Sequence, residues 1–248
     1  MKFKTLFAIF AFSVFAGTST AVAVEGSIKE IIAKSASFLV RDWVTDPDFK
    51  DYLPPQVLSV PRGTTVFGGC GAYVKGDEVA GSSYCPVTNT IFLEPKQLSF
   101  FYENFGPSSV AYVVAHEFGH AIQARYDDLE GGSEVELQAD CLAGVLIDIG
   151  SEELNITRKD TIQMAQAAYA IGDPTHGTGA QRAYALMSGM GVVEAGCSKK
   201  EMLALKNDQI SDPVYKKLST TRSSESAGID LNVTPYPKSL GSVIAADL

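Results

Sequence analysis

The chain has 248 residues, of which 46% are hydrophobic and 20% are charged, and its formal net charge is −9. This length and composition fit one globular domain with a sizeable buried core, and they exclude a fibrous or wholly disordered protein. The acidic balance argues against nucleic acid and an anionic membrane surface as partners, because both carry negative charge themselves.

Residues 1–23 have the pattern of a secretory signal peptide. Two lysines precede an apolar run over 6–16, and small residues then lead to Ala23. The run is short for a membrane span, so we expect cleavage after Ala23 rather than a retained membrane anchor. The mature protein is then expected in the periplasm or outside the cell.

Four cysteines follow, Cys70, Cys85, Cys141 and Cys197. An even number in a chain that is predicted to enter an oxidising compartment favours two disulfides. A thiolate zinc site is disfavoured because no two cysteines have the close spacing of such sites. Of the three pairings we favour Cys70 with Cys85, which closes a Gly-rich loop, and hence Cys141 with Cys197.

The first half of the chain predicts one helix followed by a small β-region. Apolar residues recur at near-helical spacing over 27–44, which indicates an amphipathic helix. Between 57 and 93 the chain has short β-prone runs broken by Gly-Gly and Gly-Ser pairs, which predict hairpins or a small curled sheet. The best strand of this region is 90–93.

The second half predicts mostly helices. An apolar stripe over 110–122 indicates a helix that begins at Pro107, a residue favoured at the first helical position. Further helices are predicted over 133–149, over 158–171 and from about Thr178 onward. The predicted fold class is therefore α+β and mainly helical, with a small N-terminal β-region.

Three parts of the chain are expected. A signal peptide over 1–23 is followed by a single domain over 24–211. Beyond 212 the chain is rich in Ser, Thr, Pro and charged residues, so 212–248 is predicted to be an extended or partly disordered tail.

The motif HEFGH at 116–120 carries the chemistry. Positions i and i+4 of a helix lie one turn apart on the same face, so His116 and His120 can bind one metal ion together. Glu117 stands next to the first ligand and is placed to take a proton from a zinc-bound water, as in H-E-x-x-H metallopeptidases. The alternative is a pair of core histidines, but burying two imidazoles and a carboxylate without a purpose is costly.

Tetrahedral zinc needs a third protein ligand and leaves its fourth position for water. The next predicted helix offers Glu136 and Asp140, again four residues apart. Glu136 has the longer reach and is assigned to the metal, while Asp140 is expected to accept a hydrogen bond from His116 and fix its tautomer. The reverse assignment stays open, as does a pair of solvated surface acids.

His176 is the remaining histidine, in a Pro-Thr-His-Gly segment, with Arg182 shortly after it. Amide hydrolysis builds an oxyanion, for which a protonated imidazole or an arginine is a suitable donor. A loop histidine is also consistent with an ordinary exposed side chain. Arg182 is expected either to assist His176 or to pair with Asp140.

The combination of segments resembles the bacterial neutral zinc metallopeptidase family. The matching segments are VAHEFGHAIQ at 114–123, ELQADCLAG at 136–144, THG at 175–177 and QR at 181–182, together with CG at 70–71 and YCP at 84–86. The resemblance covers about residues 66 to 198. It implies a minimal zincin of the glutamate-ligand type that holds one Zn²⁺ per chain, in which Glu136 is a ligand, Asp140 holds a ligand in place, and His176 is catalytic.

The chain departs from the family pattern near the expected substrate strand. It has Val-Thr-Asn at 87–89 where the family tends to place an acidic residue, and Phe-Leu-Glu at 92–94 in place of Tyr-Leu-Asp. These changes bear on specificity, because every metal and base position is intact. Family members often carry an N-terminal membrane anchor, which the predicted cleavable signal of this chain replaces.

The expected function is zinc-dependent hydrolysis of a peptide or protein substrate by an exported enzyme. An extended substrate is expected to lie along the edge of the strand at 90–93. Two alternatives use the same residues: a zinc amidase that acts on cell-wall peptide, and a non-catalytic exported zinc-binding protein or chaperone. The structural alternative has no use for Glu117, which is not a ligand. The sequence leaves the oligomeric state open.

Overall fold

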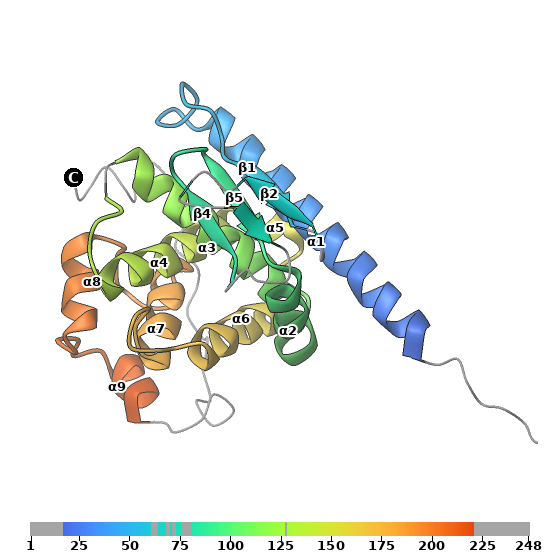
Figure 1. Ribbon diagram of the computed structural model, residues 1–248. Coiled ribbons are helices and arrows are strands. Elements are labelled where there is room, and N and C mark those ends of the chain that lie inside the picture. The colour runs from blue at the N-terminus through green and yellow to red at the C-terminus, as the bar shows by residue number, and fades with distance from the viewer. Residues whose placement is uncertain are drawn as a thin grey trace, which may run out of the picture.

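The computed structural model describes residues 17–60, 64–67, 70, 73–75, 81–126 and 128–220. The expected signal peptide falls mostly on residues 1–16, which lie outside the described residues, as does 221–248 of the expected tail. Over the described residues the chain is mainly helical with a small three-stranded sheet, so the predicted α+β class is confirmed (Figure 1).

The described helices, in chain order, are α1 (Gly17–Thr45), α2 (Pro95–Phe105), α3 (Ser108–Arg125), α4 (Ser133–Ile149), α5 (Ser151–Leu154), α6 (Arg158–Ala170), α7 (Gly179–Gly189), α8 (Lys199–Lys206) and α9 (Pro213–Thr220). The described strands are β1 (Gln56–Ser59), β2 (Thr65–Phe67), β3 (Tyr73–Lys75), β4 (Ser83–Cys85) and β5 (Thr90–Leu93). All of the strands precede α2, as the sequence pattern predicts.

Helix α1 begins ten residues before its predicted start and then packs on α3. Its buried side chains include Phe38, Leu39 and Trp43, which belong to the main hydrophobic core. The N-terminal part of α1 runs beyond the rest of the domain (Figure 1). Among the described residues, no helix combines the length and the apolarity that a membrane crossing requires.

The three-stranded sheet has the order β1-β5-β4, with β5 parallel to β1 and antiparallel to β4. All four residues of β5 are buried, which fits a central strand with an almost continuous apolar run. Because β5 is paired on both sides, the expectation that a substrate lies along the edge of strand 90–93 is wrong. Among the described strands, β4 is the edge strand on the antiparallel side of the sheet.

Helix α3 forms the centre of the domain and is buried along almost its whole length. It packs against α1 and α2, and against α4 and α6. Its contact with α4 is close at Gly119, where an added Cβ would lie 2.8 Å from the carbonyl oxygen of Ala139. A glycine is therefore needed at the fourth position of HEFGH, since any side chain there would push α4 away from the two histidines.

Helices α4 and α7 also approach each other through glycine. An added Cβ at Gly144 would lie 2.3 Å from the carbonyl oxygen of Leu186, and one at Gly189 would lie 1.8 Å from that of Cys141. Backbone contact of this kind leaves no room for a side chain at either glycine. The polar groups of α7 are consequently held directly against those of α4.

The helix boundaries agree with the sequence pattern where the pattern is long. Helix α4 has the predicted bounds, α6 ends one residue early, and Thr178 caps α7 through a capping box with Gln181. Helices α2, α5 and α8 were not predicted. Helix α9 replaces the first part of the extended tail expected from 212, because Tyr215 and Leu218 on one face of it are buried in the core.

The structure contains both favoured disulfides. Cys70 is bonded to Cys85 with a Cα–Cα distance of 5.6 Å, and Cys141 to Cys197 with one of 5.5 Å. The first ties the loop after β2 to the edge strand β4. The second ties α4 to the segment before α8, close to the residues described next.

Candidate metal centre

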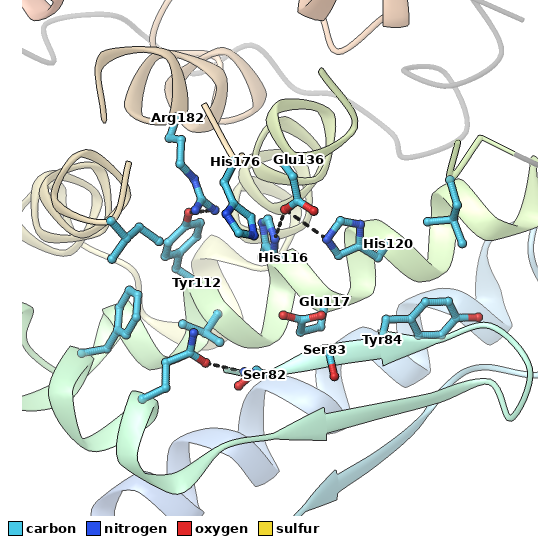
Figure 2. A pocket seen from close by; sticks show the side chains of 15 residues that line it. Ser82, Ser83, Tyr84, Tyr112, His116, Glu117, His120, Glu136, His176 and Arg182 are labelled. Atoms are coloured by element: carbon cyan, nitrogen blue, oxygen red, sulfur yellow. Dashed lines mark hydrogen bonds and ion pairs between the residues drawn. The ribbon is translucent and has the colours of Figure 1, made fainter. Parts of the chain in front are cut away.

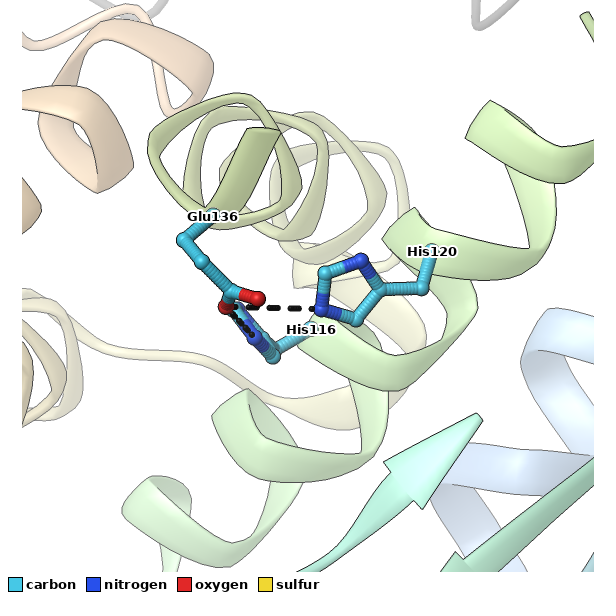
Figure 3. A group of neighbouring side chains, drawn as sticks. All are labelled: His116, His120 and Glu136. Carbon is cyan, nitrogen blue, oxygen red and sulfur yellow. Dashed lines mark ion pairs between the residues drawn. The ribbon is translucent and has the colours of Figure 1, made fainter. Parts of the chain in front are cut away.

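His116 and His120 lie one turn apart on the same face of α3, as the i, i+4 spacing predicts. Their ring centroids are 4.8 Å apart, and only 11% and 14% of their side-chain surfaces are exposed. Figure 3 shows both rings turned toward one carboxylate, that of Glu136 on α4.

Glu136 completes a set of three ligand atoms that suits a tetrahedral metal ion. Its Oε2 lies 3.3 Å from Nε2 of His116 and 3.5 Å from Nε2 of His120, and the three ligand atoms all lie within 4.8 Å of one another. Tetrahedral zinc with bonds of roughly 2.0 to 2.1 Å separates its ligand atoms by roughly 3.3 to 3.4 Å. The residues present therefore fit zinc, which would keep a fourth position for water or substrate.

The charge state of Glu136 also suits a metal ligand. Burial opposes its ionisation, but hydrogen bonding to His116 and His120 outweighs burial and holds the pKa of the carboxyl far below its usual value. The group is therefore an anion at neutral pH. Two imidazoles and one carboxylate are a known zinc ligand set that keeps one position open.

Asp140 forms a hydrogen bond with the ring nitrogen of His116 that faces away from Glu136, as the sequence predicts. Its Oδ1 accepts a hydrogen bond from His116 Nδ1 at 2.8 Å and another from the Tyr112 hydroxyl at 2.6 Å. Because Asp140 holds the proton on Nδ1, Nε2 of His116 is the ring nitrogen that a metal would take in place of the second proton. Burial opposes the charge of Asp140, but Arg182 and His116 outweigh it and lower the pKa of the carboxyl to about 2.

Arg182 pairs with Asp140, which decides between its two expected roles. Its Nε and Nη2 donate to the two carboxylate oxygens at 2.8 and 3.0 Å, and both side chains are buried. Nη2 also lies 3.3 Å from the Tyr112 hydroxyl. The guanidinium neutralises Asp140 and fixes its plane, and it also lines the cavity in front of the ligands.

His120 has a different partner, which the sequence analysis missed. Its Nδ1 lies 2.8 Å from Oε1 of Gln123, a buried residue one turn further along α3. The signal was present in the sequence, because positions i and i+3 of a helix are neighbours and HEFGH is followed by a glutamine at that spacing. Tyr112, one turn before His116 and bonded to Asp140, was missed in the same way.

Glu117 is buried in the wall of the cavity and faces the edge strand (Figure 2). Its Oε2 has no hydrogen-bond partner within the described part of the chain. Burial raises the pKa of the carboxyl, against the opposing charges of His116 and His120. A buried carboxylate with one unpartnered oxygen, next to a three-ligand site, is placed to accept a proton.

His176 lies in the loop between α6 and α7 and lines the same cavity. Its Nδ1 lies 2.8 Å from Oδ2 of Asp173, and its side chain is 45% exposed. A hydrogen bond from the Thr175 hydroxyl lowers the pKa of Asp173, which is consequently an anion beside the ring. Figure 2 places His176 between Arg182 and Glu136, with its ring turned toward the ligands.

The cavity has a volume of about 330 Å³ and is bounded on one side by β4. Ser82, Ser83 and Tyr84 lie along this edge, opposite Glu117 (Figure 2). The remaining wall comes from α2, α3, the segment before α4 and the end of α6; it combines apolar side chains with two polar ones, and its members are Gln97, Phe101, Tyr112, Val113, Leu129 and Ile171. The cavity is thus lined by an edge strand, by apolar side chains and by the three candidate ligands.

Comparison with known proteins places this site in a family. Residues 48–188 match the model of the family described as "Putative neutral zinc metallopeptidase". The chain is 30% identical over 170 residues to Uncharacterized protein YpfJ of Escherichia coli K12, which covers 54% of this chain and 56% of the relative. It is 30% identical over 154 residues to Uncharacterized protein Mb2605 of Mycobacterium bovis, which covers 46% of this chain and 52% of the relative.

The chain spans about half the length of these curated relatives. No solved structure matches it significantly. The family match takes in more than half of the chain, including α3, α4 and nearly all of α7, which carry the candidate ligands and the groups that hold them. The chain therefore belongs to the neutral zinc metallopeptidase family.

Proposed function

We propose that the chain hydrolyses peptide bonds with one zinc ion, held by His116, His120 and Glu136, and with Glu117 as the base. The observation that carries the proposal is the buried carboxylate of Glu117 beside the three-ligand cluster, whose Oε2 has no hydrogen-bond partner among the described residues. A purely structural zinc site has no use for such a group, and leaving a carboxylate oxygen buried without a partner costs stability.

Zinc bound there would supply a water of lowered pKa and polarise the scissile carbonyl. Glu117 takes a proton from the attacking water as the water oxygen bonds to the carbonyl carbon. It then passes that proton to the leaving amine, so that the C–N bond breaks with a neutral leaving group. The carboxylate returns to its starting state, as a base in a catalytic cycle must.

The oxyanion that forms on the carbonyl needs a donor, and His176 is the candidate. Asp173 accepts from Nδ1 of the ring, which leaves Nε2 to face the cavity. A proton carried on Nε2 would be donated to that oxyanion, with the carboxylate of Asp173 as the partner on the other side of the ring. Arg182 is occupied by Asp140, so its contribution is to hold the ligand system in place.

The substrate is proposed to be an extended peptide paired with β4. An edge strand offers backbone donors and acceptors to one more strand, which positions a peptide bond beside Glu117. The apolar side chains that line the cavity then favour an aliphatic or aromatic side chain next to the cleaved bond. The two disulfides support export to an oxidising compartment, the periplasm or the outside of the cell.

The test is metal analysis of the purified protein together with a casein assay. We expect about one zinc per chain, hydrolysis that a chelator abolishes and zinc restores, and product termini enriched in apolar residues on one side of the cut. Cell-wall fragments assayed in parallel separate a peptidase from an amidase. A protein that binds zinc but hydrolyses neither substrate would overturn the catalytic proposal and favour a binding protein.

His176→Ala tests the oxyanion donor. The variant is expected to keep its zinc, because the ligand set does not include His176, and to lose roughly 100-fold or more in kcat, the usual scale for one oxyanion donor. The measurement pairs zinc content with steady-state kinetics. Lys200→Met, a change at an exposed side chain of α8 that does not line the cavity, is the control. Loss of zinc from His176→Ala would show that His176 is a ligand.

A further inference from the structure

Gln123 is a buried amide on α3 that contacts the candidate ligand His120 and two groups of α4. Its Oε1 lies 2.8 Å from His120 Nδ1, while its Nε2 lies 2.7 Å from the carbonyl oxygen of Val135 and 2.9 Å from Oε1 of Gln138. The side chain is 2% exposed. Every hydrogen-bonding atom of this amide therefore points at a protein partner instead of water.

The hydrogen-bond partners determine which amide atom is the oxygen and which is the NH₂ group in both Gln123 and Gln138. Backbone carbonyls only accept hydrogen bonds, so the atom of Gln123 that faces the Val135 carbonyl has to be the NH₂ group. By the same reasoning the NH₂ of Gln138 faces the carbonyl of Cys197, 3.1 Å away. The oxygen of Gln138 then accepts from Gln123, and the oxygen of Gln123 accepts from the ring of His120.

We propose that Gln123, backed by Gln138, is a positioning residue that fixes His120 in the tautomer with its proton on Nδ1 and so presents the Nε2 lone pair to the metal. The inference rests on the proposed role of His120 as a zinc ligand. It assigns the two histidines different supports: His116 donates to the carboxylate of Asp140, whereas His120 donates to a neutral amide whose polarity is set by two backbone carbonyls.

Hydrogen bonds connect His120, Gln123, Gln138 and the Cys197 carbonyl in a chain. The last member of this chain is held in place by a disulfide. Cys197 is bonded to Cys141, which stands on α4 one turn after Gln138. The acceptor carbonyl of Cys197 and the helix that carries Gln138 are therefore tied to each other. Partners that orient the ligands of a metal affect its affinity, typically by 10- to 100-fold when one is removed.

The experiment measures zinc affinity by competition with a chromophoric chelator, with zinc alone as the probe. Gln123→Met keeps the length of the side chain and removes its donors and acceptor, so the dissociation constant for zinc should rise roughly 10- to 100-fold. Gln138→Met leaves the hydrogen bond between Gln123 and the Val135 carbonyl intact, so it should raise the dissociation constant for zinc less than Gln123→Met does. Replacing zinc by Co²⁺ should shift the visible spectrum of Gln123→Met, which reports the ligand geometry directly.

The matched control is Gln181→Met. Gln181 is also a buried glutamine whose NH₂ lies 3.0 Å from each of two backbone carbonyls, those of Leu205 and Lys206, but it has no contact with the ligands. Its loss should lower thermal stability and leave zinc affinity unchanged.

Wild-type zinc affinity in Gln123→Met, or an equal loss in Gln181→Met, would overturn the inference. If Gln123→Met does not fold, Gln138→Met provides the test. A zinc affinity and a cobalt spectrum equal to those of the wild type in Gln138→Met would then overturn the inference. A failure of the proposed catalytic function can be distinguished from a failure of this inference. If the wild-type protein binds zinc but hydrolyses no peptide, the catalytic proposal is wrong, while the zinc-affinity test of Gln123 can still be carried out.

Discussion

Glu117→Gln is expected to separate zinc binding from catalysis. The amide has nearly the volume of the carboxylate and the same helical fit, and Glu117 is not among the three ligand atoms, so the variant should retain about one zinc per chain. It loses the group that accepts the proton. Proton transfer by a positioned base contributes roughly 100- to 10,000-fold, so peptide hydrolysis should fall by that factor. Zinc content and kcat measured on the same preparation give both results.

The stability of the same variant provides an independent check. Oε2 of Glu117 is buried with no partner within the described residues, and a neutral amide costs less to bury than a carboxylate. The variant should therefore unfold at a temperature equal to or above that of the wild type, as expected where function is gained at the expense of stability. Glu130→Gln, the same change at an exposed side chain, is the control. Wild-type hydrolysis by Glu117→Gln would show that another group is the base.

The geometry of the candidate metal site was predictable from sequence because helical geometry is local. His116 and His120, and likewise Glu136 and Asp140, stand four residues apart, and a helix turns such pairs to one face whatever surrounds it. What the sequence left open was which of Glu136 and Asp140 faces the two histidines, because that depends on how α4 packs against α3. In the structure Glu136 faces both rings, while Asp140 is fully buried behind His116.

The strand partners were not predictable in the same way. The apolar run of β5 identifies a buried strand, but whether it lies at an edge depends on pairing with β1, more than thirty residues earlier in the chain. The substrate edge was therefore assigned to β5 when it belongs to β4. A similar limit applies to Gln123, because its orientation is set by the carbonyls of Val135 and Cys197, which only the folded chain brings together.

Two unpredicted helices did carry a local signal. In α2, Leu98 and Phe101 are three residues apart and both are buried, and Glu94 caps the helix before a proline at its first turn. In α9, Tyr215 and Leu218 repeat the same spacing within a polar segment. Composition alone suggested a tail there, but two apolar residues on one face are enough to dock a short helix onto an existing core.

Asp140→Ala is expected to damage both the fold and the metal site. The change leaves Arg182 buried without its counter-ion and removes the acceptor of Tyr112 and His116. Breaking a buried ion pair by removing one partner costs about 3 to 5 kcal/mol, which chemical denaturation would detect as a lower midpoint. Zinc affinity should also fall, by roughly 10- to 100-fold, because His116 loses the partner that fixes its tautomer.

The double variant Asp140→Ala/Arg182→Met separates these two effects. Replacing both members of a buried pair by apolar groups is often neutral for stability, so most of the denaturation midpoint should return. Zinc affinity should stay low, because nothing in the double variant restores the hydrogen bond to Nδ1 of His116. Recovery of stability and affinity together would show instead that Asp140 supports the site only by neutralising Arg182. Recovery of stability alone identifies Asp140 as the group that orients the first histidine, in parallel with Gln123 at the second.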